Sequence, residues 1–318
     1  MPPALPLRSS TFAEYTVLAE ISCAKVNPAL DPKKSCLFGC GIATGLGAVW
    51  NTAKVEYNSS VAVFGLGAVG FAVVQAAKAA GAGTIVGIDV NPKKFELAKK
   101  LGCSYCLNPA DHEGTPMQQA CARTALCTHA HSALMCKLCS AKHIPVQSTF
   151  RCKRGRASMA VQAFPCKHAR TLSERSPHLT PLLPLLSPPL PLQVLVGMSP
   201  TKFGFDYTFD CTGNVAVMRS ALEAAHRGWG HCTLIGVAAS GKEISTRPFQ
   251  FITGRKCTGT AFGGWKTRDA VPMLVNRALN GEIALDHYIT HNFKGVSGTT
   301  KALEALHSGD CLRAVVEY

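Results

Sequence analysis

The chain has 318 residues, which is enough for one large domain or two of ordinary size. No apolar run is long enough to span a bilayer, and the first residues lack the apolar segment of a secretory signal, so we expect a cytoplasmic protein with no membrane partner. The formal net charge is +14, but residues 120–193 hold ten Lys or Arg and one Glu, which leaves +5 for the rest and disfavours a nucleic-acid partner.

The first patterned segment predicts three elements. Aromatic and aliphatic residues favour a strand over residues 12–18, and Pro28 favours a turn over 25–28. A run of small and apolar residues then predicts a helix over 44–53.

The following stretch, residues 59–90, organises the rest of the chain. An apolar run at 61–64 predicts a buried parallel strand, an alanine-rich segment at 71–80 predicts a helix, and 84–88 predicts a second strand. The turn between the first strand and the helix matches G-x-G-x-x-G, the dinucleotide-binding pattern. We therefore assign to cofactor binding the six residues Gly65, Leu66, Gly67, Ala68, Val69 and Gly70.

Each glycine of this turn has a physical role. Gly65 permits the tight turn, Gly67 lets a pyrophosphate approach the backbone, and Gly70 lets helix and strand pack closely. Asp89 follows the second strand, where a carboxylate accepts hydrogen bonds from the adenosine ribose and repels a 2′-phosphate. The pattern therefore predicts NAD rather than NADP; the alternative is an α/β unit that binds no nucleotide.

The character of the sequence changes at residues 120–193, which contain six cysteines, a basic cluster at 151–156 and a final Pro/Leu/Ser-rich run. A segment of this length without periodicity is not expected inside a compact domain. Pro, Leu and Ser codons are mostly pyrimidine-rich and Gln193 can be CAG, so the run resembles the translated end of an intron. One hypothesis is a retained intron; the alternative is a genuine disordered loop. A basic insert that binds nucleic acid is a third hypothesis, disfavoured because no aromatic residues interleave.

The alternating pattern resumes after the insert. Further strands and helices are expected over 205–210, 215–225, 231–235, 259–265, 269–279, 299–307 and 312–316. Alternation of strands and helices predicts an α/β fold with a doubly wound parallel sheet.

Seven stretches make the chain similar to the zinc-dependent medium-chain alcohol dehydrogenases. They are STFAEYTV from Ser10, LFGCGIATGLGA from Leu37, VFGLGAVG from Val63, DVNPKKF from Asp89, FDCTGNVAVMRSALEA from Phe209, GVAASGKEISTRPFQFITGR from Gly236 and GTAFGGWK from Gly259. The last two resemble the glutathione-dependent class, class III. The resemblance implies a Rossmann NAD domain with remnants of a mainly β, GroES-like catalytic domain.

The resemblance also implies a division of the chain and a reaction. Residues 1–43 would be a catalytic-domain remnant, 44–279 the NAD domain interrupted by the insert, and 280–318 the return to the catalytic domain. The family reaction is NAD-dependent, zinc-assisted oxidation of S-(hydroxymethyl)glutathione, in formaldehyde detoxification, and of primary alcohols. A small-molecule substrate and a homodimer are implied with it.

Further cofactor contacts come from the resemblance alone. Lys94 and Thr212 would lie near the adenosine, and Arg313 near the pyrophosphate. The nicotinamide would lie beside Ile235, Gly236, Val237, Thr260, Ala261 and Phe262.

For catalysis the resemblance implies Cys40, as a ligand of the catalytic zinc, and Thr44. The family's other ligands, a cysteine and a histidine, and the four cysteines of its structural zinc lie in an N-terminal half that this sequence lacks. One cysteine cannot hold a catalytic zinc, which needs three protein ligands. We therefore expect an N-terminally truncated chain with an incomplete catalytic zinc site, no structural zinc site and impaired turnover. The alternative is a catalytically dead NAD-binding remnant.

Overall fold

A computed structural model describes residues 13–112, 192–307 and 309–318. The expected insert at 120–193 lies outside these residues except for its last two, so the retained-intron, loop and nucleic-acid hypotheses are not tested. The first of those two residues begins helix α6 (Leu192–Gly197).

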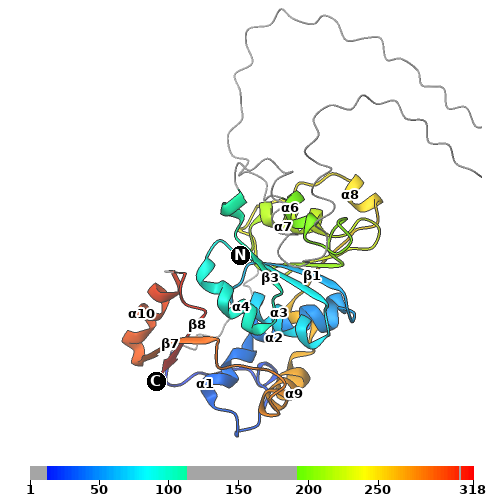
Figure 1. Ribbon diagram of the computed structural model, residues 1–318. Helices are drawn as coiled ribbons and strands as arrows, with labels where there is room; N and C mark the ends of the chain where they lie inside the picture. Colours follow the sequence, from blue (N-terminus) through cyan, green and yellow to red (C-terminus); the bar gives the residue numbers. More distant parts are fainter. Residues whose placement is uncertain (1–12, 113–191, 308) are drawn as a thin grey trace, which may run out of the picture. The chain divides into compact units, whose positions relative to one another are not determined.

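The described part is built on a six-stranded parallel sheet in the order β3-β2-β1-β4-β5-β6 (Figure 1). The order reverses between β1 and β4, so the sheet is doubly wound, and the predicted fold class is confirmed. Its strands are β1 (Ser60–Phe64), β2 (Thr84–Ile88), β3 (Tyr105–Leu107), β4 (Tyr207–Asp210), β5 (His231–Leu234) and β6 (Lys256–Gly259).

Helices cover both faces of this sheet. Strand β1 is buried throughout, with Val61 and Val63 in the hydrophobic cluster on one face and Ala62 and Phe64 in the cluster on the other. The helices of the described part, short and long, are α1 (Pro32–Ser35), α2 (Gly41–Gly47), α3 (Ala68–Ala79), α4 (Phe95–Leu101), α6, α7 (Val215–Ala224), α8 (Phe249–Ile252), α9 (Thr267–Leu279) and α10 (Gly295–His307). Helices α2, α3 and α4 contribute to the first cluster, and α6 and α7 to the second.

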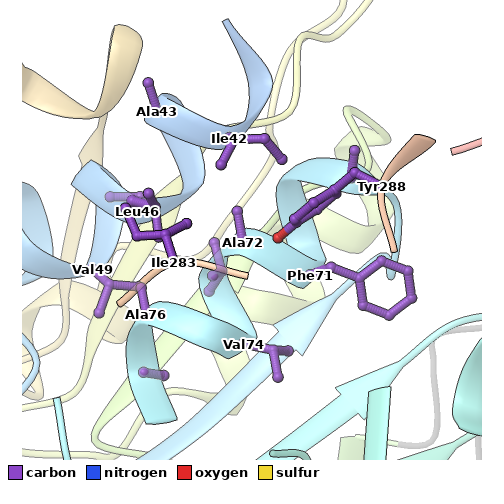
Figure 2. Packing of buried hydrophobic residues seen from close by; sticks show 14 of the residues in the cluster. Ile42, Ala43, Leu46, Val49, Phe71, Ala72, Val74, Ala76, Ile283 and Tyr288 are labelled. Atoms are coloured by element: carbon purple, nitrogen blue, oxygen red, sulfur yellow. The ribbon is translucent and has the colours of Figure 1, made fainter. Parts of the chain in front are cut away.

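Helices α2 and α3 form the centre of the first cluster (Figure 2). Ile42 and Leu46 face Ala72 of α3, and the fully buried Tyr288 lies over α3. Gly45 makes the close packing possible, because a Cβ there would lie 2.6 Å from the Ala72 Cβ and 2.6 Å from the Val69 carbonyl oxygen. A single turn of π-helix over Ala48–Ala53 continues α2.

A separate two-stranded parallel sheet follows, formed by β7 (Ile289–Lys294) and β8 (Arg313–Glu317) with α10 between them in the chain. The expected last strand is confirmed as β8. Strand β7 was not predicted, because its composition is polar and includes His291 and Asn292.

Two strand predictions are wrong. Over the described residues 13–18 there is no strand, and Tyr15 and Val17 are 90% and 98% exposed; the apolar residues there have no sheet to join. The second is the strand expected over 259–265, because β6 already ends at Gly259. The chain turns over Phe262–Gly264, where Phe262 and Gly263 have positive φ, which is incompatible with an extended strand.

The expected helix over 44–53 begins three residues earlier, at the start of α2. The domain boundary expected after residue 43 therefore falls inside this helix. That boundary and the one after residue 279 stay predictions.

No single helix in the described ranges is long and apolar enough to cross a membrane. The segments Pro32–Gly39 and Gly41–Ala53 reach that length only together, and they meet at a bend of 56°.

Candidate functional site

The glycine turn between β1 and α3 lies at the carboxyl edge of the sheet. Gly65 has φ +90°, and its N–H donates to the Ile88 carbonyl at 2.8 Å. A Cβ on Gly70 would collide with the Gly65 carbonyl oxygen, so strand and helix meet backbone to backbone. These two positions therefore require glycine for the reasons predicted from the sequence.

Gly67 differs from its two neighbours in the motif. A Cβ on Gly67 would meet no atom of the described residues within 4 Å, so open space lies above this residue. Gly67 is the N-cap of α3, and in the described part of the chain no side chain caps the helix there, so the first N–H groups of this 12-residue helix can bind an anion. Of the next three motif residues, Ala68 and Gly70 are buried in α3 and Val69 is half-buried.

Asp89 ties the end of β2 to the glycine turn. Its side chain accepts the Leu66 N–H at 2.7 Å and the Asn91 N–H at 2.8 Å. The Lys94 ammonium lies 3.1 Å from the same carboxylate, and Asp89 is only 8% exposed. The two charges expected near the adenosine thus form one ion pair beside the glycine turn.

Asp210, at the end of β4, also accepts hydrogen bonds from the turn that follows its strand. It is fully buried and accepts the Thr212 hydroxyl at 2.6 Å and the Gly213 N–H at 3.3 Å. Burial raises the pKa of this carboxyl above its usual range, and the hydrogen bonds from Thr212 and Gly213 offset part of the rise. The Thr212 methyl group in turn contacts Gly65, since a Cβ on Gly65 would lie 2.8 Å from it.

The residues after β5 pack against this second turn. The N–H groups of Ile235 and Gly236 both donate to the Asp210 carbonyl, at 2.9 and 3.0 Å. A Cβ on Gly213 would collide with the Val237 carbonyl oxygen, and the Val237 side chain is 92% exposed. Residues 235–237 therefore line the same edge as the glycine turn.

The segment after β6 connects this edge to α2. The Thr260 N–H donates to the Leu234 carbonyl at 3.2 Å, and the Thr260 and Thr52 hydroxyls lie 2.8 Å apart. The Trp265 indole donates to the Ala43 carbonyl at 2.8 Å. Residues 260–262 thus lie against the helical segment that carries the buried Thr44.

Arg313, at the start of β8, also reaches this region. Its guanidinium lies over Gly41, where a Cβ would collide with it and would lie 3.6 Å from a methyl group of Val69. The Arg313 guanidinium also donates to the Leu312 carbonyl at 2.9 Å. The structure therefore brings Arg313 to the start of α2 and to the glycine turn.

Cys40 is the exposed N-cap of α2. In the part of the chain that the structure describes, no group of three or more His, Cys, Asp or Glu is placed to hold a metal ion. These residues therefore do not fit a catalytic zinc, and among them Cys40 belongs to no such group.

Sequence reasoning missed two residues that shape the site, Gly41 and Thr52. Gly41 stands in the quoted stretch from Leu37, so its lack of a side chain was the available signal. Nothing local marks Thr52, whose partner is 208 residues away.

The chain is similar in sequence to known dehydrogenases. The model of the family described as "Zinc-binding dehydrogenase" matches residues 68–164, part of which lies outside the described residues. The chain is 42% identical over 308 residues to alcohol dehydrogenase class-3 of Oryza sativa subsp. japonica, covering 97% of this chain and 60% of the relative. It is 43% identical over 309 residues to S-(hydroxymethyl)glutathione dehydrogenase of Photobacterium damsela subsp. piscicida, covering 97% and 63%. The chain thus spans about three fifths of the length of these relatives.

Solved structures share the fold. Benzyl alcohol dehydrogenase of Acinetobacter calcoaceticus superposes with a TM-score of 0.67 at 19% identity, covering 97% of this chain and 63% of that one. An alcohol dehydrogenase zinc-binding domain protein of Burkholderia ambifaria gives 0.67 at 22% identity, covering 97% and 61%.

Proposed function

Because the chain belongs to the zinc-dependent medium-chain alcohol dehydrogenase family, we propose that it binds NAD along the carboxyl edge of its sheet and belongs to an enzyme that oxidises S-(hydroxymethyl)glutathione and primary alcohols. The observation that carries the cofactor proposal is the open space above Gly67 at the uncapped start of α3. A pyrophosphate needs this combination of a bare backbone and free N–H groups.

Different residues of this edge would contact different parts of the cofactor. The glycine turn and Arg313 would hold the pyrophosphate, and Asp89 with Lys94 would face the adenosine ribose beside Thr212. Residues 235–237 and 260–262 would enclose the nicotinamide. Bound NAD supplies the hydride acceptor of the reaction.

The described residues do not fit a zinc ion, so they supply no site for metal-assisted catalysis. The position of Cys40, exposed and without a ligand group among the described residues, favours a second candidate function: dinucleotide binding without turnover.

The homodimer is likewise a proposal. Strand β6 forms an edge of the six-stranded sheet, and no further strand of the described residues pairs with it, which supports pairing between copies. Light scattering at several concentrations measures the mass directly, and a monomeric mass throughout would exclude it.

The test of cofactor binding uses a pair of glycines. Gly67→Ala places a methyl group in open space at φ −84°, which alanine tolerates, so the fold should persist while NADH affinity, measured by fluorescence titration, falls by about tenfold or more. Gly39→Ala is the matched control, because its Cβ also meets nothing, and it should bind NADH normally. Unchanged NADH affinity in Gly67→Ala would remove the proposal.

Turnover separates the two candidate functions. NADH production from S-(hydroxymethyl)glutathione, with zinc content measured on the same sample, supports the enzyme. NADH binding without turnover supports the second candidate.

A further inference from the structure

Two cysteines face each other across the last two strands of the main sheet. Cys232 of β5 and Cys257 of β6 are register partners in a parallel pair. Neighbouring strands lie about 4.8 Å apart, within the Cα separation that a disulfide spans. Both side chains belong to the same hydrophobic cluster, so they point to the same face of the sheet.

The two thiols differ in their surroundings. Cys232 is fully buried, whereas Cys257 is half-buried on an edge strand where a small reagent can reach it. The Cys232 thiol donates a hydrogen bond to the Cys257 sulfur, which lowers the pKa of Cys257 to about 7 even though burial opposes the change. The same hydrogen bond, and after it burial, raise the pKa of Cys232. Cys257 therefore has the thiolate character of an attacking sulfur, and Cys232 supplies a neighbouring thiol.

We propose that Cys232 and Cys257 form an oxidation site that closes a disulfide across β5 and β6 on reaction with a peroxide. The Cys257 thiolate attacks one peroxide oxygen, the oxygen–oxygen bond breaks, and hydroxide leaves and takes up a proton to give water. The Cys257 sulfenic acid is then attacked by the Cys232 sulfur, and the sulfenic hydroxyl leaves with the Cys232 proton as a second water. Two thiols and one hydrogen peroxide thus give one disulfide and two waters.

The proposed disulfide would lie on the two strands that lead into the candidate site. Strand β5 runs on to residues 235–237, and strand β6 runs on to residues 260–262. The disulfide would join the two strands that carry these segments of the site. This site is independent of the proposed function, because it needs neither NAD nor a metal.

Peptide mapping tests the proposal directly. The folded chain is treated with hydrogen peroxide at a near-equal molar amount, unfolded, alkylated and digested with trypsin. Cleavage gives peptide 228–242, whose one cysteine is Cys232, and peptide 257–266, whose one cysteine is Cys257. We expect these two peptides to appear as one linked species, which a reducing agent separates.

Variants and a competing pair make the test selective. Cys257→Ser and Cys232→Ala should both abolish the link, and in Cys232→Ala the Cys257 sulfur should carry added oxygen instead. Cys103→Ser is the matched control, because it removes a buried thiol from another thiol pair, with Cys106, and should leave the link intact. The proposal is overturned if both peptides are recovered fully alkylated, or if Cys257 is linked to a different cysteine.

Discussion

Each half of the main sheet has a buried aspartate at the carboxyl end of one strand, Asp89 in one half and Asp210 in the other. The two carboxylates lie in different surroundings. Asp89 follows β2 and is paired with the Lys94 ammonium at 3.1 Å. Asp210 ends β4, and among the described residues no cation is paired with it; it is held by the Thr212 hydroxyl and backbone N–H groups. The same residue type at the same place in a βα unit is thus a charged group beside the ligand edge in one half and a support for a turn in the other.

The largest expected effect is at Asp89. In Asp89→Ala the buried Leu66 N–H loses its acceptor and Lys94 loses its partner, so the free energy of unfolding should fall by about 3 kcal/mol. NADH affinity should fall as well, because the glycine turn loses its anchor. Urea unfolding and NADH titration measure the two effects. The exposed Asp111→Ala is the control, and equal stability of the two variants would contradict the assigned role.

A smaller effect is expected when the cation alone is removed. Lys94→Gln keeps a polar side chain but leaves the Asp89 carboxylate with its two backbone donors, so the free energy of unfolding should fall by about 1 kcal/mol. The same urea unfolding experiment measures this loss. A loss as large as in Asp89→Ala would mean that the ion pair, rather than the Leu66 hydrogen bond, accounts for the effect of that variant.

The smallest effect is a change in pH dependence at Asp210. Because burial raises the pKa of this carboxyl in the folded chain, its contribution to stability is fully present below its ordinary pKa and is lost as the pH rises through the raised value. Asp210→Asn cannot titrate, so the difference between wild type and variant should shift in favour of the variant as the pH rises over that window. Unfolding free energies at several acidic to neutral pH values give the comparison. A difference that does not vary with pH would contradict the raised pKa.

The comparison also shows what the sequence could predict. The first βαβ unit followed from local signals, since an apolar run, three spaced glycines and an alanine-rich helix each act over a few residues. The ion pair of Asp89 with Lys94 and the hydrogen bond from Thr212 to Asp210 depend on the path of the chain after a strand. That path cannot be predicted from sequence periodicity. The positions of Cys40, Thr44 and the nicotinamide segments came from resemblance alone and stay predictions.

Strand predictions failed where the partner strand that would pair with a segment lies far along the chain. Residues 13–18 have the composition of a strand and no partner strand in the described part, whereas β7 has a polar composition and is paired with β8. A strand needs a neighbour to satisfy its backbone groups, and the identity of that neighbour is a property of the tertiary structure.

The contact at Gly45 has a mechanical consequence. No layer of side chains separates α2 from α3 at this point, so one helix cannot slide past the other without overlap of atoms. The two helices therefore move together as one rigid pair. The glycine turn lies at the start of α3, and Cys40 lies at the start of α2. A displacement imposed at one of these helix starts is transmitted to the other.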